Sequence, residues 1–364
     1  MKKLFLFAAL FAAVAMNAQT IVMDGKKADW ADVPMLNDPG TSPVFKMVVP
    51  QTGLTLPADA AFCAMVERTT TQKGAYAGYP IIYVDADKNK DTKEANKDPW
   101  YCPAFGPDYE MATWDEGNTF GANEEETMHE MCIVKSNFAS ASLPFAGSFN
   151  AWMLFILKED WSEYTYLPTD PSAAEWKWNA TAYHPIMVKP FTYAEFNGTH
   201  SASTVYASHE ALTIGSTINM NVSGSANDVE LWASWAVELK NPGKYTIKAN
   251  ISSTNTASVD LKLVNTATNK VVASFASEDL VEGTEVEAGE WDLSAVPAGK
   301  YMLRFSNHVQ WSEMKLNSLT FTAAGETTID NIATQQNATK VIRNGQMVIL
   351  RDGKAFNALG AEVK

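Results

Sequence analysis

The sequence has few cysteines and few histidines. Its 364 residues include three cysteines, Cys63, Cys102 and Cys132, and five histidines scattered along the chain. The cysteine spacings match no zinc-binding pattern. An exported chain permits one disulfide with one thiol left over, and three buried free thiols are an equal alternative.

Positive charge is also scarce, since the formal net charge is −14. Nucleic acids and anionic membranes require a basic face, so the sequence predicts neither as a partner. At the N-terminus, Lys2 and Lys3 precede an apolar run, and Ala18 supplies a small residue for cleavage. Residues 1–18 are therefore predicted to be a signal peptide, too short for a membrane span, of a secreted or cell-surface protein.

Recognisable catalytic motifs are missing. The chain has no GxSxG motif and no phosphate-binding glycine loop. In "NEEETMHEMC", His129 stands beside Glu130, but no second histidine follows at the spacing of a zinc hydrolase. The sequence predicts no enzyme and no catalytic residues.

Helical periodicity is nearly absent, and short alternating apolar runs recur instead. In "VELWASWAVELKNPGKYTIKANI", the alternation on both sides of "NPGK" predicts a hairpin with one buried face. We expect an all-β protein with two tandem jelly-roll-like β-sandwich domains and a small C-terminal β-meander. The expected parts are a signal peptide (1–18), a first sandwich (19–190), a second sandwich (191–323), a polar linker (324–339) and a tail (340–364).

The tail carries two tight-turn signals, Asn344-Gly345 and Asp352-Gly353, between apolar strands. They predict a three-stranded meander. The stretch "VIRNGQMVILRDGKAFNALGAEV" resembles the C-terminal sorting segments of Bacteroidetes proteins exported by the type IX secretion route. The resemblance implies export to the cell surface or the medium, with the secretion machinery as a partner.

The first half opens with "IVMDGKKADW" and continues with "IIYVDADKNKD" and "GPDYEM". These segments resemble the family-9 carbohydrate-binding modules and related DOMON-like sandwiches. The resemblance implies a glycan-binding β-sandwich over residues 19–190.

The second half contains "WASWAVELKNPGKYTIKANI", "GEWDLSAVPAGKYMLRFSN" and "KLNSLTFT", which resemble the jelly-roll carbohydrate-binding modules of families 6 and 35. The resemblance implies that Trp291 stacks on a sugar and that Glu195 ligates calcium. Lys315 stands where the family has a sugar-binding asparagine just before the final strand, and a long cationic donor there favours a uronate. Trp311 is a second candidate platform.

Oxygen-bearing side chains follow an apolar run at every second position: Asp85, Asp87, Asn89 and Asp91. Six to eight such oxygens suit calcium. An EF-hand is excluded because Lys90 stands where that motif needs glycine. A structural calcium loop and a solvated acidic turn both remain open.

Tryptophans in polar surroundings are the remaining candidates for sugar stacking: Trp100, Trp176 and Trp178. For any single tryptophan, core packing is the stronger expectation. Taken together, the sequence predicts an exported, non-catalytic protein that binds plant or host polysaccharide through exposed aromatics. The alternatives are a glycoside hydrolase or polysaccharide-processing accessory, and a surface structural or adhesion protein without a sugar site.

Overall fold

The protein is built almost wholly from β-strands. In the computed structural model, the helices among the described residues are three short 3-10 turns, η1 (Lys27–Trp30), η2 (Lys135–Phe138) and η3 (Ala202–Thr204). The predicted all-β class is confirmed. None of these helices has the length and apolar character needed to cross a membrane. The structure describes residues 19–36, 44–67, 80–87, 109–112, 117–124, 127–138, 147–156, 164–167, 186–209, 212–221, 231–254, 257–307, 313–324, 339–343, 346–351, 354–357 and 362–363.

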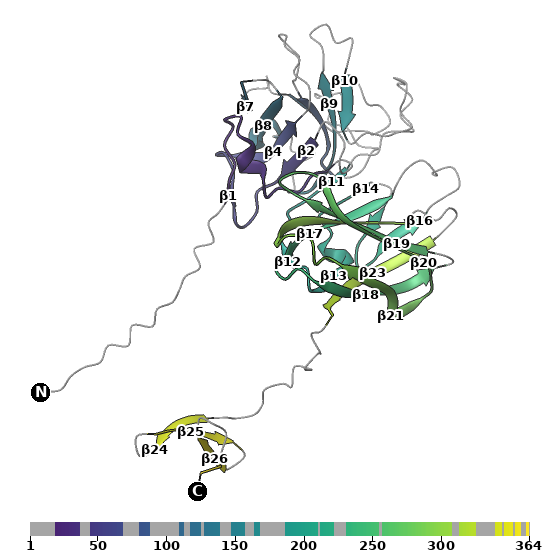
Figure 1. The fold of residues 1–364 in the computed structure, drawn as a ribbon. Coiled ribbons are helices and arrows are strands. Elements are labelled where there is room, and N and C mark those ends of the chain that lie inside the picture. The colour runs from purple at the N-terminus through teal and green to yellow at the C-terminus, as the bar shows by residue number, and fades with distance from the viewer. Residues whose placement is uncertain are drawn as a thin grey trace, which may run out of the picture. The chain divides into compact units, whose positions relative to one another are not determined.

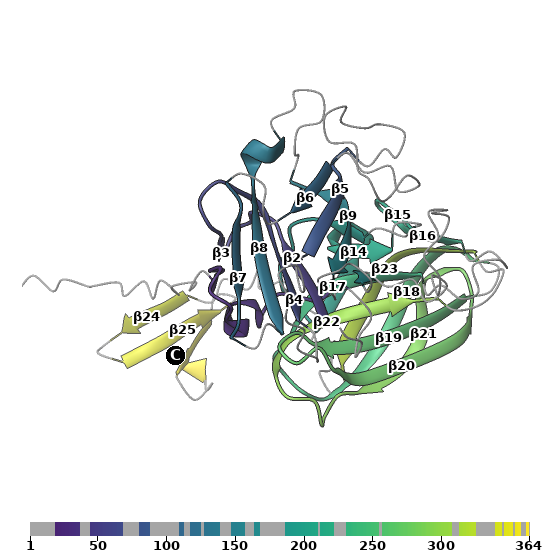
Figure 2. The same cartoon turned by 90° about the horizontal axis from the view of Figure 1, so that it is seen from above.

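A four-stranded antiparallel sheet forms the centre of the first half. Its order is β2 (Val44–Val48), β4 (Ala60–Glu67), β8 (Met128–Val134) and β7 (Thr119–Ala122). Figure 2 shows these strands side by side. The inner strands are buried on both faces, so their sequences are continuous apolar runs and do not alternate.

The two faces of this sheet belong to different clusters of buried side chains. One face packs with Ile21, Trp30 and Val33 of the N-terminal segment. That segment is joined to the body by a short parallel pair, β1 (Gln19–Thr20) with β3 (Leu54–Thr55). The other face packs into a larger cluster that both halves of the chain share.

A second sheet of eleven strands runs through both halves. Its path is β20 (Val271–Leu280), β19 (Ala257–Asn265), β22 (Gly299–Ser306), β17 (Trp232–Leu239), β14 (Ala207–His209), β11 (Ile186–Val188), β9 (Phe149–Ile156), β5 (Pro80–Asp85) and β6 (Tyr109–Ala112), with β10 (Tyr164–Leu167) on β9 and β12 (Ala194–Glu195) on β17. The short strand β11 is the joint, because it pairs with β9 on one side and with β14 on the other. In Figure 1, β11 lies between the teal and the green strands.

A third sheet closes the sandwich of the second half. Its order is β15 (Thr213–Ile214), β16 (Ile218–Asn221), β23 (Glu313–Ala323), β18 (Lys244–Thr254) and β21 (Gly283–Asp292), with β13 (Gly198–Ser201) on β23. From β17 to β23 the chain passes repeatedly between this sheet and the eleven-stranded one, as in a jelly roll.

The predicted hairpin over residues 229–251 is wrong in its pairing, although both strands form where the alternation placed them. β17 pairs with β14 and β22, whereas β18 pairs with β21 and lies in the other sheet. β17 also has two buried faces, since Trp232, Ser234 and Ala236 are buried as well as Trp235. Its outer face is covered by the shared cluster.

The division expected near residue 190 does not separate two bodies. Residues 1–321 form one compact unit, and 322–364 form a second. The shared cluster contains Phe62 and Met131 from the first half together with Trp232 and Met302 from the second. Two sandwiches are present, but they share a sheet and a core.

The second unit holds a four-stranded antiparallel meander, β24 (Thr339–Arg343), β25 (Gln346–Arg351), β26 (Lys354–Asn357) and β27 (Glu362–Val363). The three expected strands are present, and β27 adds a fourth that the sequence analysis missed. The end pairs Arg343↔Gln346 and Arg351↔Lys354 agree with the two predicted turns. Residues 325–338 of the expected linker lie outside the described residues.

Candidate functional site

Trp291 does not form the stacking surface that the family resemblance implied. Only 4% of it is exposed, and it faces the sandwich interior from β21. Its ring centroid lies 6.1 Å from that of Phe196 and 6.1 Å from that of Phe275. The expectation is corrected because the indole is enclosed by other rings and presents no free face to a sugar.

The other described indole side chains are buried too. Trp30, Trp232 and Trp235 are each 5% exposed or less. The predicted platforms Trp100, Trp176, Trp178 and Trp311 lie outside the described residues and stay predictions.

Lys315 lies on the outer face of the third sheet. The sequence analysis placed it before the final strand, but β23 begins at Glu313, so Lys315 is inside the strand and its side chain is exposed. Met314 and Leu316 on either side of it point into the core. This alternation fixes Lys315 on the solvent side of the sheet.

Polar side chains from three neighbouring strands surround Lys315. Asn219 of β16 is its direct cross-strand partner. On the other side, Asn317 Nδ2 donates a hydrogen bond of 2.8 Å to Asn250 Oδ1 of β18. Ser252 Oγ lies 3.3 Å from the Lys315 carbonyl oxygen and 3.4 Å from Asn317 Oδ1. We call these five residues the amide face.

The chemistry of the amide face is that of a hydrogen-bonding surface. Each amide presents donors and acceptors, a hydroxyl does both, and an ammonium presents three donors. The Asn317–Asn250 hydrogen bond fixes the orientation of two of these groups before any ligand arrives. Sequence patterning could place each residue outward on its strand, but it could not show which strands are neighbours.

Ion pairs continue the same sheet surface towards β21. Lys244 pairs with Glu290 at 3.0 Å, and Lys248 pairs with Glu285 at 3.1 Å. The hydrogen bond to Glu290 raises the pKa of the Lys244 ammonium. The charges of these two ion pairs compensate each other, whereas four of the five residues of the amide face carry no charge.

The predicted calcium ligands are only partly described. Asp85 ends β5 with 3% of its surface exposed, and its Oδ2 accepts a hydrogen bond of 3.3 Å from Asn150 Nδ2. Asp87 is exposed, while Asn89 and Asp91 lie outside the described residues. Within the part of the chain that the structure describes, no three metal-binding side chains come together.

Glu195, implied as a calcium ligand by the family resemblance, lies in β12. Its Oε2 forms an exposed ion pair of 3.3 Å with Lys240 Nζ. Calcium ligation by this residue stays a prediction.

Glu130 is a buried carboxylate that is held by hydrogen bonds from the N-terminal segment. It lies on β8 with none of its surface exposed, and it accepts hydrogen bonds from Trp30 Nε1 at 2.5 Å and from Gly25 N at 2.6 Å. Burial raises the pKa of this carboxyl. Its contacts attach the N-terminal segment to the sheet.

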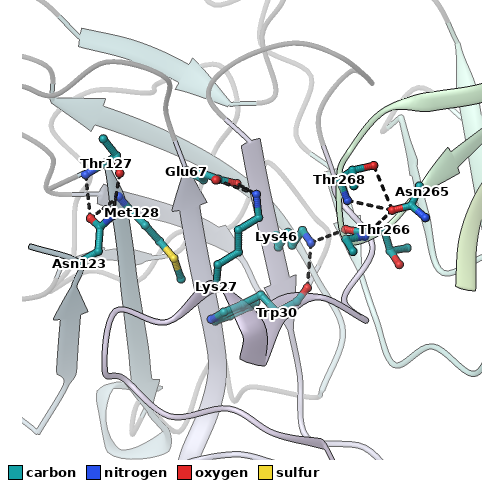
Figure 3. Close-up of polar contacts among 11 residues, drawn as sticks. Lys27, Trp30, Lys46, Glu67, Asn123, Thr127, Met128, Asn265, Thr266 and Thr268 are labelled. Carbon is teal, nitrogen blue, oxygen red and sulfur yellow. Dashed lines mark hydrogen bonds and ion pairs between the residues drawn. The ribbon is translucent and has the colours of Figure 1, made fainter. Parts of the chain in front are cut away.

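Lys46 is a buried residue that the sequence analysis missed. Its Nζ donates to the Trp30 carbonyl oxygen at 2.8 Å and to the Thr266 carbonyl oxygen at 2.7 Å, which joins the two halves (Figure 3). Burial lowers the pKa of its ammonium to about 7. The available signal was a lysine at the centre of the apolar run "VFKMV".

Comparisons with known proteins identify no family. No family model matches the chain, and no curated protein matches it. Solved structures similar to it include carbohydrate-binding modules. One is a family-6 module from Clostridium stercorarium in complex with cellobiose, with 10% identity, a TM-score of 0.26, and coverage of 36% of this chain and 98% of that one.

A second similar structure comes from a study of promiscuous carbohydrate-binding modules of the β-sandwich superfamily. It has 9% identity and a TM-score of 0.22, with 77% of this chain and 96% of that chain covered. The isomalto-dextranase of Arthrobacter globiformis in complex with panose has 11% identity and a TM-score of 0.23, with 79% and 39% covered. At these identities and scores, the ligands of those proteins carry no argument for this chain.

Proposed function

We propose that the chain is an exported, non-catalytic protein that binds plant or host polysaccharide through the amide face. The observation that carries the proposal is the cluster of uncharged hydrogen-bonding side chains on three adjacent strands, with Lys315 exposed among them. A sugar presents several hydroxyl groups on one side, and a fixed array of amides suits such a ligand better than it suits an apolar one.

The charge of Lys315 favours a glycan with carboxylate groups. An ammonium donates strong charge-assisted hydrogen bonds to a carboxylate. The surrounding protein carries a net charge of −14, so Lys315 differs in sign from most of the charged surface. We therefore propose uronate-containing polysaccharides as the preferred class.

Binding to the full chain by calorimetry tests the proposal. Asn317→Ala removes one hydrogen-bonding group worth about 1 kcal/mol, so we expect about fivefold weaker binding. Lys315→Ala is expected to weaken the binding of uronate-containing polysaccharides more than the binding of neutral ones. Lys244→Ala is the matched control, because it changes an exposed lysine of the same sheet outside the amide face and is expected to bind as the unaltered chain does.

The alternatives give different results. If no polysaccharide of a broad panel binds, a structural or adhesion role replaces the proposal. If soluble oligosaccharides accumulate during incubation, the chain is a hydrolase. Equal losses in Asn317→Ala and Lys244→Ala would place the binding site elsewhere.

Export is the second part of the proposal and rests on residues 1–18 and on the separate C-terminal unit. Removing 340–364 is expected to leave the protein within the cell envelope of a type IX-secreting host. Unchanged release into the medium would contradict a sorting role for the tail.

A further inference from the structure

Two cysteines face each other across the inner strands of the four-stranded sheet. Cys63 of β4 and Cys132 of β8 are direct cross-strand partners, and the ladder around them is regular from Phe62 to Glu67. Their exposed fractions are 0% and 1%. Both side chains lie in the cluster that contains Trp30.

Their positions meet the backbone requirement of a disulfide. Directly opposed residues of an antiparallel pair have Cα atoms about 4.5 or 5.5 Å apart, depending on the pair type. Disulfides span about 4.4–6.8 Å between Cα atoms, so either type fits. Directly opposed residues of an antiparallel pair point to the same face of the sheet, so the two sulfur atoms lie side by side in one buried cluster.

We propose that Cys63 and Cys132 form a disulfide in the exported protein. The inference rests on the export that the proposed function includes, because thiols stay reduced in the cytosol. It settles the pairing that the sequence left open, with Cys102 as the remaining thiol.

The oxidant is a disulfide compound, either a thiol oxidase of the exporting compartment or oxidised glutathione. One cysteine thiolate attacks that disulfide and releases one thiol, which leaves a mixed disulfide on the protein. The other cysteine attacks the mixed disulfide and releases the second thiol. The protein loses two electrons and two protons, and the oxidant gains both.

Oxidation takes place while the chain is folding, before the two cysteines are buried. In the folded protein both cysteines are buried, with 0% and 1% of their surfaces exposed, so an oxidant in solution does not reach either thiol. The N-terminal segment with Trp30 packs on the same face of the sheet. The bond therefore forms before that segment docks and is shielded afterwards.

The direct test maps the disulfides of the full chain after export. Secreted protein is unfolded in a denaturant that contains an alkylating agent and no reductant. It is then digested, and its peptides are identified by mass spectrometry. We expect the Cys63 peptide linked to the Cys132 peptide, with Cys102 alkylated. Three alkylated cysteines, or a link that includes Cys102, would overturn the proposal while leaving glycan binding unaffected.

A second measurement does not depend on the secreting host. The full chain is refolded with reduced and oxidised glutathione, and its Tm is compared with that of chain refolded in reductant. A bond between residues 63 and 132 closes a long loop, so reduction is expected to lower Tm by roughly 5–10 °C.

Two variants identify the bond that is responsible. The double variant Cys63→Ala/Cys132→Ala is expected to have the same Tm with and without reductant, whereas Cys102→Ala is expected to keep the full difference. A difference that disappears in Cys102→Ala would contradict the assigned pairing. If the double variant does not fold, the peptide map of the unaltered chain still decides.

Discussion

Lys46 is a residue whose protonation works against folding. Its pKa is about 7 in the folded chain, against 10.5 for an unperturbed lysine. Between these values the unfolded chain holds a proton that the folded chain lacks, so the free energy of unfolding rises with pH. The slope from this one group is about 1.4 kcal/mol per pH unit.

Lys46→Met removes this slope. We expect the difference in free energy of unfolding between the unaltered chain and the variant to shift by about 2 kcal/mol in favour of the unaltered chain from pH 7 to pH 9. Urea unfolding at several pH values measures it. Lys240→Met, which changes an exposed lysine, is the control and is expected to show a constant difference. A constant difference for Lys46→Met as well would mean that the amine is charged when folded.

Gly25 is a residue for which both backbone and space require glycine. Its φ is +75°, and an added Cβ would lie 2.2 Å from the Ala122 carbonyl oxygen. Its N–H also donates to the buried Glu130 carboxylate. Gly53 has a similar φ of +81° but open space around the added atom.

These two glycines form a matched pair for mutagenesis. Gly53→Ala is expected to cost about 1–2 kcal/mol, the price of a left-handed backbone. Gly25→Ala is expected to cost at least twice as much, because the contact with Ala122 must also be relieved by moving the N-terminal segment. Urea unfolding compares them, and equal costs would show that the segment is free to shift.

At the scale of elements, alternation predicted strands well and their partners poorly. β18 has the alternating burial that the sequence indicated, but whether it pairs with β17 depends on which way the chain turns after Pro242. Local sequence does not encode that choice in a sandwich whose consecutive strands change sheets. The burial of Trp291 could not be predicted from the sequence either. Its chain neighbours are acidic, which suggests exposure, and the rings that enclose it, Phe196 and Phe275, are far away in sequence.

The calcium prediction depends on the segment from Asp85 to Asp91, at the end of β5 and after it. If it holds calcium, chelator lowers the Tm of the full chain, since a ligand at a hundredfold excess over Kd stabilises by about 2.7 kcal/mol. Asp87→Ala is expected to remove the chelator response, whereas Asp279→Asn, which changes an acidic residue of β20 at the other end of the eleven-stranded sheet, is expected to keep it. A Tm that is the same with and without chelator would favour the solvated acidic turn.

At the scale of the whole molecule, the sequence indicated two sandwiches but not that they share a sheet and a core. A change in composition near residue 190, before which all three cysteines lie, suggested a boundary, whereas the three residues of β11 continue the sheet across it. Contacts between residues far apart in sequence, such as Lys46 with Thr266, leave no local pattern. The tail, whose turns and strands are local, was predicted more closely.

One truncated chain and two fragments test the shared core and the independence of the tail. Ending the chain at residue 324 is expected to leave one cooperative thermal transition, because residues 1–321 form a unit of their own. Fragments 19–190 and 191–323, made separately, are expected to bind a hydrophobic dye and to lack a cooperative transition, since each exposes its part of the shared cluster. Cooperative unfolding of either fragment would contradict the shared core.

The joint at β11 also bears on how such a chain is inherited. A domain that recombination moves between genes must close its own core, so that it folds beside any new neighbour. Here a break in the gene near residue 190 would leave β9 and β11 on one side and β14 on the other. It would also divide one core between two genes. The two sandwiches therefore have to be passed on together, and a natural gene that carries one of them alone would need new residues where the other now packs.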